Sequence, residues 1–281
     1  MSVIQLKHRT QRGDLLHATL YGAEQHGVAP CLVYAHGFKG FKDWAFVPYA
    51  GEYFAQRGYS FLCFNFSHNG IGEDGQTFSE LDKFEQNTFS LEISELEEVI
   101  TQVAHTDLLG SDLHGKLGLI GHSRGGGIAV LAAQNRPEVQ ALATWASVST
   151  FDRYEKEVCQ AWRKRGYHEV VNSRTGQTLR LGTALLDEVE RQAQTKLNIL
   201  AAARKFQRPW LILHGQEDDT VPFFEAEQLN IYGHPDLTEL RLIPGAGHTF
   251  GATHPQDAEQ VPAPLTQLLD ATCTFFDQHL R

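Results

Sequence analysis

The sequence contains few cysteines, and their positions argue against cross-links and thiolate metal sites. Only four of the 281 residues are cysteine, at Cys31, Cys63, Cys159 and Cys273. They lack the short spacing of metal-binding pairs, and three lie in apolar or amphipathic runs, where a reduced cysteine packs as a small hydrophobe. We therefore expect no disulfide. The H-E-x-x-H pattern of zinc enzymes is also missing, and His248 and His254 have no partner at ligand spacing, so we expect no metal.

Long apolar runs and an excess of positive charge are missing too. No apolar segment reaches about 18 residues, so the sequence predicts no membrane span. Residues 1–7 alternate like a strand and lack the apolar core and cleavage site of a signal peptide, so we expect a cytoplasmic location. The 24 lysines and arginines stand against 34 acidic residues, which gives a net charge of −10. This charge disfavours nucleic acids and anionic membrane surfaces as partners.

Alternating strand and helix patterns run along most of the chain. Such alternation is typical of an α/β fold with a mostly parallel sheet covered by helices on both faces. Eight strands are predicted, over residues 3–8, 14–22, 30–36, 59–66, 116–121, 141–148, 209–214 and 239–244. Apolar residues recur every three or four positions from Phe89 to Val103 and again from Leu265 to Phe276, which predicts two amphipathic helices. The length fits one large α/β domain with an insertion.

Residues 151–206 interrupt this alternation. About 55 residues separate two strands where a crossover helix needs far fewer. We predict a small cap, or lid, inserted between the two parts of the core domain, 1–150 and 207–281, over the C-terminal edge of the sheet. The Thr175-Gly176 turn suggests a hairpin, and a polar helix with Glu188, Arg191 and Lys196 ends the segment. Its aromatic residues Tyr154, Trp162 and Tyr167 are candidate pocket walls or, equally, the cap's own small core.

One basic run, Arg163-Lys164-Arg165, is a local exception to the acidic balance. We interpret it as the solvated face of a helix. The alternative is a contact with a substrate carboxylate, because basic groups over an active site suit an anionic ester or acid.

A serine lies where a buried strand turns sharply into a helix. The run Gly121-His122-Ser123-Arg124-Gly125 follows apolar residues 117–120 and opens a helix of small residues. The flanking glycines let neighbouring chain approach closely, and the turn exposes the hydroxyl, so Ser123 is a candidate nucleophile. The glycines at 125–127 miss the spacing of a phosphate-binding loop and no Lys-Ser/Thr pair follows. We therefore expect no nucleotide cofactor.

Two later segments supply an acid and a base. Asp218 lies just past an apolar strand, and its neighbours Glu217 and Asp219 could substitute for it on composition alone. His248 lies on a glycine-flanked loop after the last strand, while His214 is interpreted as a strand-end residue that supports the acid loop. The chain order serine, aspartate, histidine is the order of α/β-hydrolases and differs from those of chymotrypsin and subtilisin.

Four motifs in this order resemble the α/β-hydrolase superfamily, within it the dienelactone-hydrolase-like, serine-aminopeptidase-like and cinnamoyl-esterase-like bacterial hydrolases. They are His36-Gly37-Phe38 after a strand, the serine turn, the acid segment that begins at His214, and the Gly247-His248 loop. The resemblance implies that Asp218 is the acid and that the backbone N–H groups of Phe38 and Arg124 form an oxyanion hole. One departure is the run Asn65-Phe66-Ser67-His68-Asn69-Gly70, where many relatives have an acidic residue followed by Arg-Gly.

The sequence thus predicts a cofactor-independent serine hydrolase. Ser123 attacks an ester carbonyl, His248 transfers protons, Asp218 orients His248, and water releases the acyl-enzyme. The expected substrate is a small-molecule carboxylic ester, and the expected state is a monomer or homodimer. An amide hydrolase of aminopeptidase or acyl-peptidase type is the alternative within hydrolases. A non-catalytic ligand-binding protein of the same fold is the alternative outside them.

Overall fold

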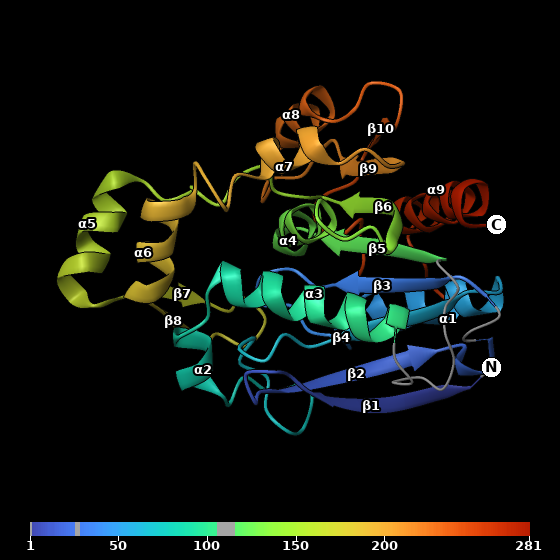
Figure 1. Cartoon of the computed structure of the whole chain (residues 1–281). Coiled ribbons are helices and arrows are strands. Elements are labelled where there is room, and N and C mark those ends of the chain that lie inside the picture. The colour runs from blue at the N-terminus through green and yellow to red at the C-terminus, as the bar shows by residue number, and fades with distance from the viewer. Residues whose placement is uncertain (1, 26–28, 106–115) are drawn as a thin grey trace.

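The computed structural model describes residues 2–25, 29–105 and 116–281, and its centre is a sheet of eight strands (Figure 1). In spatial order the strands are β1 (Val3–Arg9), β2 (Leu15–Tyr21), β4 (Ser60–Phe64), β3 (Cys31–Ala35), β5 (Leu117–His122), β6 (Val139–Trp145), β9 (Trp210–Gly215) and β10 (Thr238–Ile243). β2 pairs antiparallel with both β1 and β4, and all other neighbours pair in parallel. The predicted eight-stranded, mostly parallel sheet is confirmed.

Alternate side chains of the central strands pack into two core layers, one on each face of the sheet. All five residues of β3 are buried; Cys31 and Val33 belong to one apolar cluster, whereas Leu32 and Tyr34 belong to the other. This is the period of two expected of a strand covered on both faces. The edge strand β1 is mostly exposed. Continuous apolar runs therefore mark the centre of the sheet, and alternating runs mark its edge.

Helices cover both faces of the sheet (Figure 1). One layer contains α1 (Val47–Gln56) and α9 (Ala263–Leu280). The other contains α3 (Phe89–His105), α4 (Arg124–Ala133), α7 (Ile199–Lys205) and α8 (Phe224–Tyr232), and short elements are α2 (Leu81–Glu85) and the 3-10 turn η1 (Ala23–Gln25). The apolar stripes that predicted α3 and α9 face the core. Among the described helices, none combines the length and the hydropathy needed to cross a bilayer.

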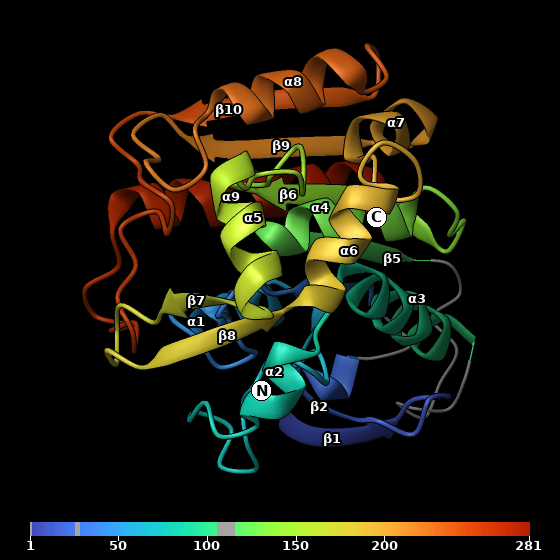
Figure 2. The same ribbon diagram turned by 90° about the vertical axis from the view of Figure 1, so that its left-hand side faces the viewer.

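Between β6 and β9 the chain leaves the sheet. It forms α5 (Lys156–Arg165), an antiparallel hairpin of β7 (Tyr167–Val171) and β8 (Thr178–Gly182), and α6 (Thr183–Gln192) before it reaches α7. Figure 1 shows α5, α6 and the hairpin to one side of the sheet, and Figure 2 shows them in front of it. The hairpin turn lies where it was predicted, and Gly176 there has a φ of 72°. The predicted polar helix is shorter than expected, because α6 ends before Lys196.

Hydrogen bonds attach this segment to the core near the strand ends. The Glu188 carboxylate on α6 accepts the backbone N–H groups of Phe89 (2.7 Å) and Ser90 (3.1 Å) in the first turn of α3. A carboxylate there satisfies free N–H groups and complements the helix dipole. Lys39, after β3, donates its Nζ to the Val171 carbonyl at the end of β7 (3.0 Å). In contrast, α7 packs against α4 and α8 and so belongs to the helical layer of the sheet.

The basic run 163–165 lies on α5, and its two arginines form ion pairs with acidic residues. Arg163 pairs with Asp187 and with Glu190 (2.5 Å) of α6, and Arg165 lies 3.3 Å from Glu169. All three basic residues are exposed. This placement favours the interpretation of the run as a solvated helix face.

Candidate active site

Ser123 lies in the turn between β5 and α4 with a strained backbone. Its φ of 57° and ψ of −123° are rarely adopted by residues other than glycine, and its N–H donates to the Trp145 carbonyl at 2.8 Å. A side chain at Gly125 would lie 2.4 Å from the carbonyl oxygens of Ala35 and His36. A Cβ at Gly121 would in turn collide with the Gly125 carbonyl at 2.4 Å. The glycines are thus required for the close packing that holds this turn.

Ser123, His248 and Asp218 form one hydrogen-bonded series. The Ser123 hydroxyl lies 3.0 Å from His248 Nε2, and His248 Nδ1 lies 2.8 Å from Asp218 Oδ2. With Nδ1 protonated towards the carboxylate, Nε2 is free to accept the serine proton. The three residues come from loops after β5, β10 and β9, which end at the same edge of the sheet. The candidate nucleophile, the candidate base and the candidate acid therefore meet in a geometry that suits general base catalysis.

The environment of Asp218 keeps it ionised. Its Oδ1 accepts the backbone N–H groups of Thr220 (2.9 Å) and Val221 (2.8 Å). Burial alone raises the pKa of Asp218, but hydrogen bonds from His214 and His248 outweigh burial and hold the pKa well below its ordinary value. The neighbours Glu217 and Asp219 are exposed. Of the three acidic residues that the sequence left open, Asp218 is the one that contacts His248.

Two further histidines support the loops that carry His248 and Asp218. His122 Nε2 donates to the His248 carbonyl at 3.1 Å, and burial together with nearby His248 lowers the pKa of His122 to about 3. His214 Nε2 donates to the Val221 carbonyl at 2.7 Å and lies 3.3 Å from Asp218 Oδ2. His214 therefore supports the acid loop, in agreement with its interpretation from sequence. The sequence did not predict the contact of His122 with the His248 loop, because the motif around Ser123 does not indicate which distant loop the residue before the serine contacts.

The predicted oxyanion-hole residues Phe38 and Arg124 both lie near Ser123. A Cβ at Gly37 would fall 2.9 Å from Ser123 Cβ, so the loop after β3 passes directly over the nucleophile. Arg124 is the first residue of α4, where backbone N–H groups have no partner within the helix. Both residues share a pocket with Ser123. This placement leaves both residues as candidates for the oxyanion hole.

The loop of residues 65–70, which departs from the family pattern, supports the loop after β3 that carries Phe38. His36 donates its Nδ1 proton to the Gly37 carbonyl (2.9 Å), while its Nε2 accepts the N–H of Phe66 at 3.3 Å. Burial lowers the pKa of His36 to about 4, so this ring is neutral. Asn65 Oδ1 accepts the N–H of Lys42 at 2.7 Å. Residues of the unusual run therefore position the chain beside Ser123.

The same loop contributes to a group of three side chains with metal-binding atoms. Ligand atoms of Asp14, His68 and Glu95 lie within 4.8 Å of one another. The Glu95 carboxylate, however, accepts both the N–H (3.0 Å) and the hydroxyl of Ser67. Burial raises the pKa of Glu95 to about 7. Ser67 hydrogen-bonds both Glu95 oxygens, so this carboxylate holds the loop that begins after β4.

Two pockets meet at Ser123, and we name each after a residue found in only one of them. The His248 pocket has a volume of about 340 Å³, and its lining includes Lys39, Trp44, His122, Asn172, Arg174 and His248. The Phe151 pocket has a volume of about 290 Å³, and its lining includes Phe89, Arg124, Val148, Phe151, Arg153 and Tyr154. Both pockets are also lined by Phe38. The candidate nucleophile Ser123 thus lies between a pocket lined by the candidate base His248 and a pocket walled by aromatic rings.

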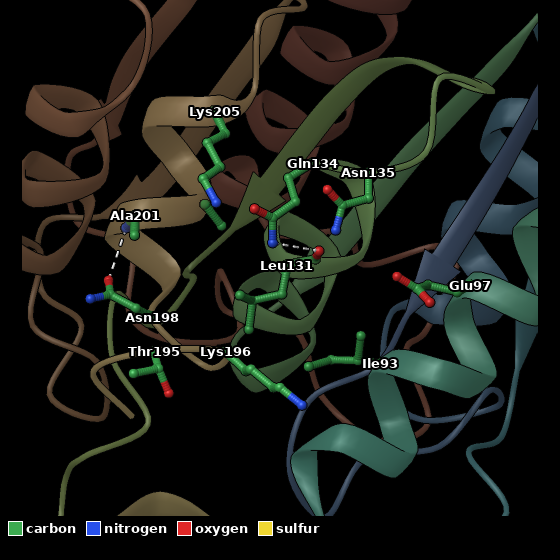
Figure 3. A pocket seen from close by; sticks show the side chains of 11 residues that line it. Ile93, Glu97, Leu131, Gln134, Asn135, Thr195, Lys196, Asn198, Ala201 and Lys205 are labelled. Carbon is green, nitrogen blue, oxygen red and sulfur yellow. Dashed lines mark hydrogen bonds between the residues drawn. The ribbon is translucent and has the colours of Figure 1, made fainter. Parts of the chain in front are cut away.

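A third pocket, of about 330 Å³, lies between α3, α4 and residues 195–205 (Figure 3). Lys196, Lys205, Gln134 and Asn135 contribute polar side chains to it. Its lining contains neither serine nor histidine. Among the described residues that line it, there is thus no counterpart of the hydrogen-bonded pair Ser123 and His248.

A family model supplies the assignment that the geometry suggests. The model described as the alpha/beta hydrolase family matches residues 32–261. The chain belongs to this family. No curated protein sequence matches this hydrolase significantly.

Solved structures share the fold of this hydrolase over its whole length. The esterase domain of a Rhodothermus marinus protein has a TM-score of 0.65 at 18% identity, covering all of both chains. Est1E from Butyrivibrio proteoclasticus, solved with ferulic acid bound, has a TM-score of 0.69 at 20% identity over 98% of each chain. Dienelactone hydrolase from Anabaena variabilis has a TM-score of 0.64 at 18% identity, covering 100% of this chain and 99% of its own.

The three aromatic residues predicted as pocket walls have different positions in this hydrolase. Tyr154 lines the Phe151 pocket. Trp162 is buried, with its ring 5.2 Å from that of Tyr154, and contributes to the apolar core. Tyr167 lies between the guanidinium groups of Arg165 and Arg180. Trp162 and Tyr167 line neither pocket at Ser123, whereas Phe89 and Phe151, which the sequence did not single out, do.

Proposed function

We propose that this hydrolase cleaves carboxylic esters through an acyl-enzyme formed on Ser123. The hydrogen-bonded series from Ser123 through His248 to Asp218, at the meeting point of two pockets, carries the proposal. A serine hydroxyl is a weak nucleophile near neutral pH, so a base must take its proton as the bond forms. The ionised Asp218 would stabilise the imidazolium that results.

In the first half of the proposed reaction, Ser123 Oγ attacks the ester carbonyl and its proton moves to His248 Nε2. The carbonyl oxygen becomes negative and would accept hydrogen bonds from the N–H groups of Phe38 and Arg124. Each such donor lowers the barrier by about 3 kcal/mol in comparable sites. His248 then returns the proton to the alcohol oxygen as its bond to the acyl carbon breaks.

The return of the proton from His248 indicates which part of the substrate each pocket would bind. The leaving alcohol must lie within reach of His248 Nε2, so it would occupy the His248 pocket, and the acyl group would occupy the Phe151 pocket. A water molecule entering after the alcohol leaves would be activated by His248 and would release the acid. The aromatic walls of the Phe151 pocket favour an acyl group with a substantial apolar part.

We further propose that the segment from α5 to α6 acts as a cap over the site. Its hairpin supplies Asn172 and Arg174 to the His248 pocket, and Tyr154, just before α5, lines the Phe151 pocket. The Glu188 contacts with α3 would hold this cap in place. α7 lies outside the proposed cap.

Labelling with a fluorophosphonate tests the nucleophile. We expect intact-mass labelling of the wild type, no labelling of Ser123→Ala, and slow labelling of His248→Ala. Ser94→Ala, at an exposed position on α3, is the matched control and should label normally. Folded wild type that does not label would contradict the proposal and favour a non-catalytic ligand-binding protein. A parallel panel of p-nitrophenyl esters and amino-acid p-nitroanilides would separate ester from amide hydrolysis.

A further inference from the structure

We propose that the His248 pocket binds a carboxylate carried by the alcohol part of the ester, and that Lys39 and Arg174 bind it. This inference rests on the proposed function, because the proton return by His248 is what assigns this pocket to the leaving group. It adds a substrate class to the proposed reaction: esters whose alcohol part carries a carboxylate group. The evidence is the distribution of charge between the two pockets.

The cations of the Phe151 pocket each have a carboxylate partner. Arg124 Nε lies 3.1 Å from Glu92, and Arg153 Nη1 lies 2.5 Å from Glu225. A substrate anion in that pocket would therefore meet guanidinium groups that are already neutralised. Little net positive charge is available on the acyl side of Ser123.

The cations of the His248 pocket have no such partner. Within residues 2–25, 29–105 and 116–281, no acidic side chain forms an ion pair with Lys39 or Arg174. Both make hydrogen bonds to neutral acceptors instead: Lys39 Nζ to the Val171 carbonyl (3.0 Å) and Arg174 Nη2 to the Lys39 carbonyl (2.8 Å). Two unneutralised positive charges thus line the space beside the base.

These two cations are held near each other by the packing around them. The Arg174 guanidinium lies over the rings of Phe41 (5.5 Å) and Trp44 (5.4 Å), and the Lys39 ammonium lies 5.6 Å from the Phe38 ring. Burial and the neighbouring Arg174 lower the pKa of Lys39, and burial lowers the pKa of Arg174. A bound anion would relieve this repulsion and further favour the charged forms of both groups. A carboxylate suits the site because a guanidinium presents paired donors to its two oxygens.

Asn172 supplies a further donor to the same pocket. This residue is only 2% exposed, yet its Nδ2 has no hydrogen-bond partner among the described atoms. Its Oδ1 accepts the N–H of Arg174 at 3.2 Å, which fixes the amide beside that residue. An unpaired buried donor costs stability and is most simply explained by an acceptor that arrives with a ligand.

A pair of chromogenic esters with one acyl group tests the inference. One is the phenylacetate ester of 5-hydroxy-2-nitrobenzoic acid, and the other is the phenylacetate ester of its primary amide. The two alcohols have nearly the same shape and differ in one negative charge. The readout is the ratio of kcat/KM for the acid to kcat/KM for the amide, and comparing ratios between variants cancels the intrinsic reactivity of each ester.

We expect the ratio to favour the acid in the wild type and to fall by about 5- to 10-fold in Arg174→Gln and in Lys39→Gln, as for charge-assisted contacts that are partly open to solvent. The ratio should also fall as NaCl is raised, because salt screens such contacts. Lys164→Gln, at an exposed position of α5, is the matched control and should keep the wild-type ratio.

The outcomes separate the two proposals. Ser123-dependent hydrolysis of the amide ester with no preference for the acid, or with a ratio that Arg174→Gln and Lys39→Gln leave unchanged, would overturn this inference alone. Hydrolysis of neither ester, or equal hydrolysis by Ser123→Ala, would overturn the proposed function and the inference with it.

Discussion

The two pockets beside Ser123 are similar in size but differ in the charge that they present. In the Phe151 pocket, Arg124 and Arg153 are each paired with a carboxylate from a helix of the core. In the His248 pocket, Lys39 and Arg174 are hydrogen-bonded, within the part of the chain that the structure describes, only to backbone and amide oxygens. The number of cations is therefore a poor guide to the charge of a site. What a substrate meets depends on which cations already have an acidic partner.

The largest expected effect concerns chemistry that both pockets share. In Asp218→Asn, His248 loses the carboxylate that fixes its tautomer, so kcat should fall by about 10³- to 10⁴-fold for every ester, whatever its charge. Asp219→Asn, at the exposed neighbouring position, should keep kcat within a few-fold. Steady-state kinetics on the acid and amide esters would check both variants. A variant at Asp218 that lost activity on only one of the two esters would contradict a common catalytic centre.

A change in the Phe151 pocket should alter acyl preference alone. The Phe151 ring stacks on Phe89 at 3.9 Å between centroids, so Phe151→Leu removes part of an aromatic wall. We expect kcat/KM for phenylacetyl relative to acetyl esters to fall about 10-fold. The preference between acid and amide alcohols should not change. Phe275→Leu, in the core layer on the other face of the sheet, is the control for the loss of core volume. An equal shift in both preferences would mean that the pockets are not independent.

Removing one partner charge should make the pockets more alike. Glu225→Gln keeps an acceptor for the Ser149 N–H but leaves Arg153 without its carboxylate. The Phe151 pocket would gain positive charge, so we expect p-nitrophenyl hemisuccinate hydrolysis to improve about 5-fold relative to the pentanoate ester. Glu227→Gln, exposed on the same helix, should leave this ratio as in the wild type. If Glu225→Gln also left this ratio as in the wild type, the pairing of Arg153 would not explain the difference between the pockets.

The last prediction concerns stability as a function of pH and leaves the preferences of the two pockets unchanged. Burial lowers the pKa of His122 from 6.5 to about 3. Between these two pH values, His122 binds a proton in the unfolded chain but not in the native state. This contribution to stability is complete above pH 6.5 and is lost as the pH falls towards 3, with a slope of about 1.4 kcal/mol per pH unit for one proton. His122→Gln should flatten the rise of the free energy of unfolding between pH 4 and 6. Urea unfolding at several pH values measures this slope, and an unchanged slope would exclude His122 as its source.

Local sequence patterns predicted the fold because each carries its own physical constraint. Apolar runs such as 117–120 identify buried strands, and a glycine two residues either side of Ser123 is needed where chain segments touch. The same patterns located Ser123 and His248, since both lie directly after strands that end at one edge of a parallel sheet. Asp218 needed more than composition, because Glu217 and Asp219 are equally acidic. Its burial and its contact with His248 distinguish it in the structure.

By itself, then, the sequence determined the sheet, the order of its strands along the chain and the loops that carry the candidate nucleophile, acid and base. Tertiary structure decided which side chains surround them. Glu225 lies far from Arg153 in sequence, and Lys39 and Arg174 are on separate elements, so no local pattern indicates that one cation is paired and the others are not. Trp162 and Phe151 are both buried in one apolar cluster, but the tertiary structure brings only Phe151 of the two to the wall of a pocket at Ser123. Charge pairing and pocket walls depend on distances between residues remote in sequence, and these distances are fixed only when the layers pack.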